Sequence, residues 1–349
     1  MKRVVFAVPG SLDTPTGGYA YDRRIMAELR QLGWVVDHLD IGDGFPAPDE
    51  ATRSAARSLL SALPAGQPIV LDGLALGVLP DVAAELASQH PLVALVHYPL
   101  ALESGLTPQR ADALRHSEKS ALAAVRQVVV TSPTTARLVV SGYGVPAEMI
   151  TIARPGSDPV PRVARNPNAV PNILSVGAVV PRKGFDVLVS ALAMLTDLPW
   201  RLTIAGDLQR DRHEAARLQN LIAQIRLADR IRTPGAVSPS QLAILFGEAD
   251  LFALASRFEG YGMAYAEALS HGLPVVGTTA GAIPDTVPKG AGSLVPSDDP
   301  AALAAALRSV LVDPEHRRLL SEAALMAARM LPTWPQSAAI FAATLDRLA

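Results

Sequence analysis

The chain has 349 residues, of which 49% are hydrophobic and 18% are charged, and it contains no cysteine. This length is too great for one hydrophobic core and indicates two globular domains of roughly 150 to 200 residues each. The net charge of −2 gives no global attraction to nucleic acid, and the lack of cysteine excludes disulfides, thiolate catalysis and cysteine-bound metals.

The first residues, Met1-Lys2-Arg3, run directly into an apolar segment that ends at Pro9-Gly10. This start lacks the long apolar region and the cleavage site of a signal peptide. Charged residues, Pro or Gly interrupt every apolar run before the roughly 18 to 20 residues that a bilayer span needs. We therefore expect a soluble, cytoplasmic protein that does not bind nucleic acid, and nothing in the sequence supports association with a membrane.

Short β-branched runs alternate with amphipathic helices along the first half of the chain. Helical patterns cover Tyr19–Leu32 and Pro108–Val125. Continuous apolar strands separated by helices are typical of a parallel sheet that is covered on both faces. The expected strands are Val4–Val8, Val35–Leu39, Ile69–Leu71, Leu92–Val96, Val128–Thr131 and Met149–Ile152. We predict a doubly wound, Rossmann-like domain over residues 1–160.

Five prolines between Arg154 and Pro171 predict an extended linker, after which the alternation of strands and helices restarts. Residues 161–333 are therefore predicted to form a second Rossmann-like domain. The expected strands are Ile173–Val176, Leu202–Ile204, Arg230–Arg232, Leu251–Leu254 and Val275–Gly277. A last helix, Trp334–Leu348 within residues 334–349, either crosses back to the first domain or packs as an ordinary helix. The fold class is α/β, with two domains expected to face each other across a cleft that holds the ligands.

The stretch Arg257–Leu269 carries the most specific pattern, because an apolar strand leads through a glycine-containing turn into a helix. Free backbone N–H groups at such a helix start suit a diphosphate. Glu259, before the helix, can reach sugar hydroxyls. Glu267, within it, can accept hydrogen bonds from ribose hydroxyls. Taken alone, each glutamate has an ordinary alternative, either as a helix cap or as a solvated side chain.

This stretch resembles family 4 of the retaining glycosyltransferases with the GT-B fold, the glycosyl transferases group 1. The family signature is two glutamates separated by seven residues, and Glu259 and Glu267 match that spacing. The surrounding pattern is matched by Gly260, Tyr261, Gly262 and Ala268. The resemblance implies that residues 161–333 bind a nucleotide sugar, with Glu259 at the donor sugar and Glu267 at the ribose.

Further segments of the second half resemble the family in the same order. Val176–Phe185, with Gly177, resembles the loop that grips the donor diphosphate, and Gly206 stands at the next strand end. The pair Pro234-Gly235 resembles the turn that binds the base, and Gly281–Asp285 resembles a turn near the donor sugar.

Two adjacent cations, Arg182 and Lys183, precede a helix that is predicted to begin at Gly184. Together with the helix N-terminus they can neutralise a departing diphosphate; the alternative is a pair of solvated loop charges. The family usually places an arginine directly after the loop glycine, where this chain has Ala178. We predict that Arg182 takes the place of that arginine.

The first half matches the family more weakly. Gly17 and Gly18 follow the first strand and either bring backbone amides close to a phosphate or sugar or form a plain turn. His97 ends the run Leu92–Val96, and the resemblance implies that it contacts the donor sugar. Residues 1–160 are expected to bind the acceptor. The candidate acceptor contacts, which could equally form a solvated helix face, are Tyr19, Tyr21, Asp22 and Arg23.

The aspartates contain no Asp-x-Asp spacing, so we expect neither a metal nor a cofactor. The resemblance implies a retaining hexosyltransferase that uses a UDP- or GDP-linked sugar, with His97, Glu259 and Lys183 as catalytic residues. We add Arg182 to them as the predicted substitute for the family arginine. We assign no protein general base, since the departing phosphate can take the acceptor proton.

Several other functions share this architecture. A GT-B epimerase or hydrolase of sugar nucleotides and a non-catalytic sugar-nucleotide-binding protein remain as alternatives. A nicotinamide-dependent dehydrogenase is disfavoured, because no Gly-x-Gly-x-x-Gly follows the first strand. The acceptor is a small molecule, a glycan or a lipid-linked sugar, and we prefer a soluble one.

Overall fold

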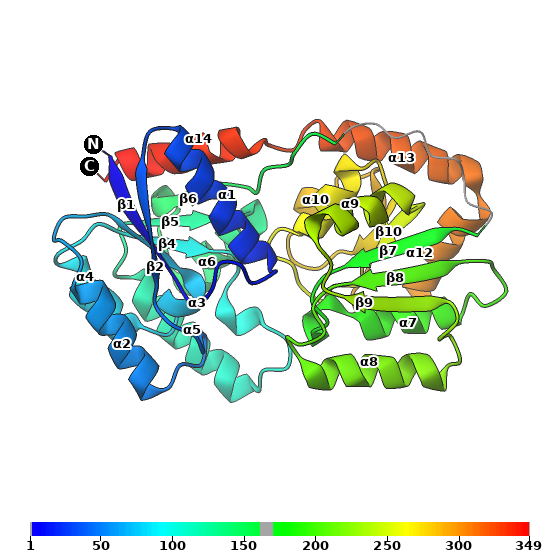
Figure 1. Cartoon of the computed structure of the whole chain (residues 1–349), viewed down its shortest axis with the longest axis horizontal. Helices are drawn as coiled ribbons and strands as arrows, with labels where there is room; N and C mark the ends of the chain where they lie inside the picture. Colours follow the sequence, from blue (N-terminus) through cyan, green and yellow to red (C-terminus); the bar gives the residue numbers. More distant parts are fainter. Residues whose placement is uncertain (1, 161–169, 349) are drawn as a thin grey trace. The chain divides into compact units, whose positions relative to one another are not determined.

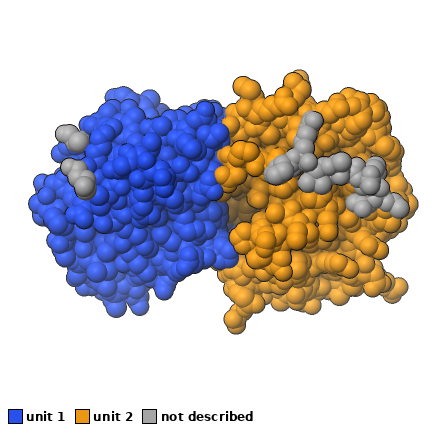
Figure 2. All heavy atoms as spheres, turned by 45° about the horizontal axis from the view of Figure 1, so that its top comes forward, with its two compact units in different colours: residues 1–156, 332–349 blue, residues 157–331 orange. Residues whose placement is uncertain are grey.

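The computed structural model describes residues 2–160 and 170–348. The chain forms two compact units, residues 1–156 with 332–349 (unit 1) and residues 157–331 (unit 2), coloured blue and orange in Figure 2. Each unit contains one six-stranded parallel sheet flanked by helices (Figure 1), which confirms the predicted α/β class. The part of the predicted linker that contains Pro161 and Pro167 lies outside the described residues. Residues 153–160 have no regular secondary structure.

The four inner strands of unit 1 have side chains that are buried on both faces, as their continuous apolar runs predict, whereas its two edge strands are partly exposed. The strands lie in the order β2-β1-β3-β4-β5-β6 and all adjacent pairs are parallel. They are β1 (Arg3–Val8), β2 (Val35–Asp40), β3 (Ile69–Asp72), β4 (Leu92–Val96), β5 (Gln127–Val130) and β6 (Ile150–Ile152). The helices are α1 (Gly17–Gln31), α2 (Glu50–Ser61), α3 (Gly73–Leu76), α4 (Pro80–Ala87), α5 (Pro108–Leu122), α6 (Pro133–Tyr143) and α14 (Trp334–Asp346), with short 3-10 turns at Leu100–Leu102 and Ala147–Met149.

The last helix, α14, packs beside α1 in unit 1 (Figure 1). It begins with a capping box, in which Thr333 and Gln336 satisfy each other's backbone N–H groups. Its buried face includes Phe341, whose ring lies 5.5 Å from that of Phe6 in β1. The helix therefore covers the N-terminal sheet, the first of the two arrangements that the sequence allowed.

Unit 2 repeats the architecture with the strand order β12-β11-β10-β7-β8-β9. Its strands are β7 (Asn172–Val176), β8 (Arg201–Ala205), β9 (Ile231–Gly235), β10 (Leu251–Ala253), β11 (Val275–Thr278) and β12 (Gly292–Val295). The helices are α7 (Phe185–Ala193), α8 (Arg212–Gln224), α9 (Pro239–Glu248), α10 (Met263–Ser270), α11 (Ile283–Thr286), α12 (Pro300–Val312) and α13 (Pro314–Ala328), with a 3-10 turn at Pro181–Lys183. Strand β12 was not predicted, since it is a half-buried edge strand that opens with Gly292-Ser293.

In each sheet the strand order reverses direction once, because later strands of the chain lie on the opposite side of the first strand. In unit 1 this switch point lies between β1 and β3, and in unit 2 it lies between β7 and β10. Ligands of doubly wound α/β folds bind outside the carboxyl ends of the strands at this point. The two switch points are therefore the first places to look for a site.

No helix in residues 2–160 and 170–348 combines the length and the apolar character that crossing a bilayer requires.

Candidate functional site

The turn Pro181–Lys183 follows β7 and lies at the switch point of unit 2. Gly184 ends this turn with φ +62°, and a Cβ there would lie 2.0 Å from the carbonyl oxygen of Ala255. Only glycine permits both this backbone conformation and so close an approach. The backbone N–H of Arg257 then donates to the carbonyl of Arg182 at 2.7 Å. The turn after β7 is thereby fixed against the segment that follows β10.

This docking brings Arg182, Lys183 and Glu259 together with Ser256 in a group that we call the cation–carboxylate cluster. Lys183 Nζ lies 2.7 Å from Glu259 Oε1, and Arg182 Nη1 lies 3.3 Å from Oε2. The Ser256 hydroxyl donates to Oε1 at 2.7 Å. Burial raises the pKa of Glu259, but Lys183 and Arg182 outweigh that effect and hold the pKa below its usual value. The cluster therefore carries one net positive charge.

A second ion pair, between Arg257 and Asp186, also stabilises the turn Pro181–Lys183. Arg257 contacts both carboxylate oxygens of Asp186, in the first turn of α7, at 3.1 and 2.9 Å. It also donates to the carbonyl of Pro181. The sequence patterns did not identify this ion pair or Ser256. The available signal for Ser256 was a polar residue directly after the apolar run 251–255.

Three predicted glycines lie at the carboxyl ends of neighbouring strands. A Cβ on Gly206, after β8, would lie 1.8 Å from the carbonyl oxygen of Gly177, after β7. The N–H of Gly206 donates to the carbonyl of Gly235, the last residue of β9, at 2.9 Å, and Pro234 beside it is exposed. Backbone groups of these residues therefore line the carboxyl ends of β7, β8 and β9, next to the cluster.

The signature stretch places its glycines and Glu267 around the start of α10. Gly262 caps the helix with φ +92°, Gly260 is buried, and the carbonyl of Tyr261 accepts a hydrogen bond from Thr286. Glu267 is the fifth residue of α10 and half-buried. Burial, assisted by the charge of Asp158, raises the pKa of Glu267 to about 7.

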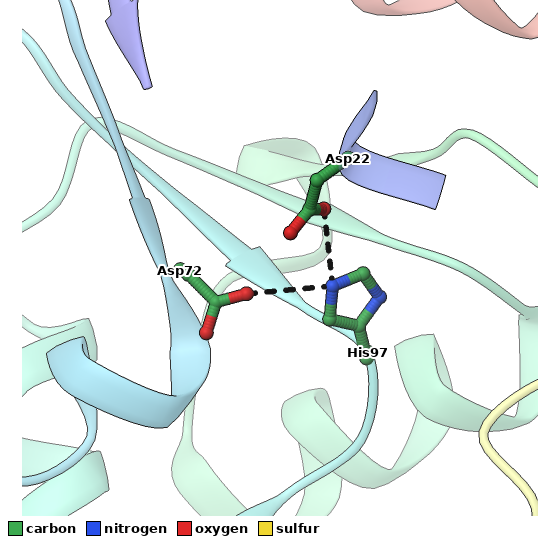
Figure 3. A group of neighbouring side chains, drawn as sticks. All are labelled: Asp22, Asp72 and His97. Atoms are coloured by element: carbon green, nitrogen blue, oxygen red, sulfur yellow. Dashed lines mark ion pairs between the residues drawn. The ribbon is translucent and has the colours of Figure 1, made fainter. Parts of the chain in front are cut away.

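The switch point of unit 1 gathers His97 with two carboxylates (Figure 3). Its Nε2 lies 3.2 Å from Asp22 Oδ1 and 3.5 Å from Asp72 Oδ2. Asp72 is the last residue of β3 and was not predicted, although an acidic residue at a strand end before Gly73 was a usable signal. Among the described residues, these three form the set whose ligand atoms, all within 4.8 Å of one another, could hold a metal ion.

The other predicted site residues of unit 1 differ from one another in burial and in contacts. Gly17 is exposed, whereas a Cβ on Gly18 would lie 3.3 Å from the His97 ring, so Gly18 permits the ring to approach α1. The hydroxyl of Tyr19 donates to the carbonyl of Pro9 at 2.6 Å, and Arg23 is half-buried.

Tyr21 corrects the prediction of an acceptor contact. Its side chain is fully buried, and its hydroxyl donates to the carbonyl of Ala153 at 2.9 Å. Tyr21, Ile25 and Leu29 follow the helical spacing of the buried face of α1. Asp22 is also fully buried and pairs with His97, so neither residue lies on a solvated helix face.

Comparison with known proteins gives one family and a consistent fold. Residues 160–325 match the family described as glycosyl transferases group 1. An MMP alpha-(1->4)-mannosyltransferase of Mycolicibacterium hassiacum is 27% identical over 85% of this chain and 74% of its own length. A D-inositol 3-phosphate glycosyltransferase of Pseudarthrobacter chlorophenolicus is 32% identical over 69% of this chain, and the match spans 60% of that protein.

Solved structures match both units. Sucrose-phosphate synthase from Thermosynechococcus elongatus has a TM-score of 0.84 and 20% identity over 100% of this chain and 99% of that chain. HepE from Anabaena, solved in complex with UDP-glucose, has a TM-score of 0.79 and 18% identity over 99% of this chain and 100% of that chain. The shared fold is GT-B, as predicted.

Proposed function

The chain carries a domain of the glycosyl transferases group 1 family, and from this premise we propose that it transfers a hexose from a nucleotide-diphosphate sugar to a hydroxyl acceptor. The observation that carries the proposal is the cation–carboxylate cluster at the switch point of unit 2. Arg182 and Lys183 stand where α/β folds bind ligands, and Glu259 leaves them one net positive charge toward an anion. The UDP-glucose bound by the Anabaena neighbour is a donor of this class.

The chemistry that this cluster suits is departure of a nucleoside diphosphate. The bond between the anomeric carbon and the diphosphate oxygen breaks, and the acceptor oxygen forms a new bond to that carbon. The leaving phosphate takes the proton of the acceptor hydroxyl. Arg182 and Lys183 stabilise the negative charge that develops on the diphosphate, which is electrostatic preorganisation of the oxyanion-hole type.

Retention of the anomeric configuration and independence from metal belong to the same proposal. The spacing of Glu259 and Glu267, which resembles the retaining family, supports the first. The two cations beside the expected phosphate position support the second, since they supply the charge that a divalent ion would otherwise provide. A cytoplasmic location and a soluble acceptor stay predictions.

The test combines donor screening with an acceptor-dependent assay. UDP- and GDP-sugars that bind should raise the melting temperature of the chain. With the stabilising donor and a panel of sugar and polyol acceptors, nucleoside diphosphate should be released only when acceptor is present, and NMR should show a product of retained configuration. Full activity in the presence of EDTA is expected. Activity that only added Mg²⁺ or Mn²⁺ restores would overturn metal independence.

Two lysines of unit 2 offer a matched pair of variants. Lys183→Met removes a cation of the cluster and should abolish most turnover, whereas Lys289→Met alters an exposed lysine and should leave turnover unchanged. Release of diphosphate without acceptor, or a changed sugar in the recovered donor, would identify a hydrolase or an epimerase instead. Tight donor binding without any turnover would indicate a non-catalytic binding protein.

A further inference from the structure

Gly184 joins the turn Pro181–Lys183 to α7, and its backbone alone does not fix the direction of the turn. Glycine adopts several backbone conformations at little cost, since it has no Cβ. Among the described residues, no side chain caps either the turn or the start of α7. The positions of Arg182 and Lys183, the two cations of the turn, therefore depend on contacts from other segments.

Arg257 supplies such contacts on both sides of Gly184. Before the glycine, its backbone N–H donates to the carbonyl of Arg182 at 2.7 Å, and its guanidinium donates to the carbonyl of Pro181. After the glycine, the same guanidinium donates to both carboxylate oxygens of Asp186 at 3.1 and 2.9 Å. One residue therefore holds the turn and the first turn of α7 in a fixed relation to each other.

The guanidinium of Arg257 is itself fixed by a third segment. Its Nε donates at 2.6 Å to Oδ1 of Asp298, which lies in the loop between β12 and α12. Each of its three nitrogens therefore has an acceptor, and a planar guanidinium that is held in this way has one orientation. The side chains of Arg257 and Asp186 are 24% and 22% exposed, so water screens this pair less than a pair on the open surface.

Another bidentate ion pair of unit 2 has no contact with the turn and serves as a comparison. Arg308 donates to both carboxylate oxygens of Asp197 at 2.8 and 2.9 Å, and the two side chains are 42% and 56% exposed. Asp197 follows the C-terminal end of α7, whereas the turn Pro181–Lys183 precedes its N-terminal end. The two pairs share their chemistry and differ in what they hold.

We propose that Arg257 and Asp186 are positioning residues, which hold Arg182 and Lys183 in the orientation that stabilises a departing diphosphate. This inference rests on the proposed function, because it concerns the cations of the same cluster. The charged groups of Arg257 and Asp186 are engaged with each other and with the turn, so they act through the two cations. A stabilising group that is displaced by about 1 Å can cost about a hundredfold in rate, and the pair prevents such a displacement.

Asp186→Asn removes the charge that Arg257 contacts and keeps the size of the side chain. The variant should stay folded in thermal unfolding and should bind UDP or GDP more weakly in calorimetry. Its kcat/KM should fall about tenfold or more, because displaced cations stabilise the diphosphate less. Asp186→Glu, which can again pair with Arg257, should recover part of both values. An affinity and a kcat/KM equal to those of the unmodified chain in folded Asp186→Asn would overturn the proposal.

Two matched variants separate positioning from the loss of an ion pair as such. Arg217→Gln removes the other cation that contacts Asp186, at 3.2 Å, and Asp197→Asn breaks the bidentate pair with Arg308. Neither variant should change nucleotide affinity or kcat/KM. Losses in these controls as large as that in Asp186→Asn would mean that ion pairs of unit 2 act only through stability, and would contradict the positioning role.

A double-mutant cycle tests whether Asp186 acts through the cations. In an Arg182→Ala background, Asp186→Asn should lower kcat/KM by a smaller factor than in the unmodified chain, because one of the positioned cations is already absent. Equal factors in both backgrounds would reject the coupling and with it the proposal. If no donor and acceptor support transfer, the proposed function fails, whereas the same cycle measured on the affinity for nucleoside diphosphate still decides the positioning role.

Discussion

The charge of Glu259 should oppose the binding of the nucleotide that the cluster is proposed to hold. Glu259 shares Lys183 and Arg182 with any diphosphate that reaches them. Glu259→Gln removes the negative charge and keeps the size of the side chain and one hydrogen-bonding oxygen. We therefore expect the variant to bind free nucleoside diphosphate more tightly, and to turn over more slowly because that product leaves more slowly.

The size of the effect follows from the geometry of the cluster. Glu259 Oε1 lies 2.7 Å from Lys183 Nζ, and an ammonium–phosphate hydrogen bond adds about 2.8 Å. A phosphate oxygen on Lys183 is thus no more than about 5.5 Å from the carboxylate, where two unit charges repel by about 0.8 kcal/mol at a dielectric constant of 80 and about 3 kcal/mol at 20. The dissociation constant should fall by a factor between about 4 and about 150.

Isothermal titration calorimetry with UDP and GDP measures this difference, and thermal unfolding shows whether the variant is folded. Asp229→Asn provides a control, because it removes the charge of an exposed carboxylate elsewhere in unit 2. The control should bind as the unmodified chain does. An equal or weaker affinity in folded Glu259→Gln would refute the reasoning and would mean that the phosphates do not bind beside Lys183.

Four further predictions have defined outcomes. Arg182→Ala should lower kcat/KM roughly ten- to hundredfold, since a charge-assisted contact is worth about 1.5 to 3 kcal/mol. Adding Ala178→Arg to that variant should restore part of the lost activity. Unchanged kinetics in Arg182→Ala would mean that Arg182 is only a solvated charge of the loop. Glu267→Ala should weaken the bare nucleoside diphosphate as well as the complete donor, and an unaltered calorimetric affinity would reject its ribose role. Gly206→Ala should destabilise the chain by roughly 1 to 3 kcal/mol in urea unfolding, because the added Cβ meets the carbonyl of Gly177 at 1.8 Å; a stable variant contradicts the packing argument. Burial raises the pKa of Glu118 from 4.5 to about 7, so the contribution of Glu118 to stability is complete below pH 4.5 and is lost as the pH rises through 7. Between pH 5 and pH 8.5, the free energy of unfolding should therefore fall by up to roughly 3 kcal/mol less in Glu118→Gln than in the unmodified chain. An equal fall in both proteins would mean that another group causes it.

The strands of both units could be predicted because their signal is local. Leu92–Val96 is a continuous apolar run that is buried on both faces, and its expected and observed bounds agree. The signature around Glu259 and Glu267 is likewise contained in one short stretch of chain. Strand β12 was missed because Gly292 and Ser293 have low strand propensity and its position at the sheet edge leaves it half-buried.

What the sequence alone determined was therefore the fold class, the family resemblance and the types of residue at the strand ends. The pairing of Lys183 with Glu259, which lie 76 residues apart, follows from the strand order of unit 2, where β7 and β10 are neighbours. The same holds for Asp72, which meets His97 because β3 lies beside β4, and for Asp22, which reaches it from α1. The burial of Tyr21 was decided when α14 packed beside α1, with the Trp334 ring 6.0 Å from that of Tyr21. These contacts join residues far apart in the chain, and local propensity carries no information about partners that only the packing of distant elements brings together.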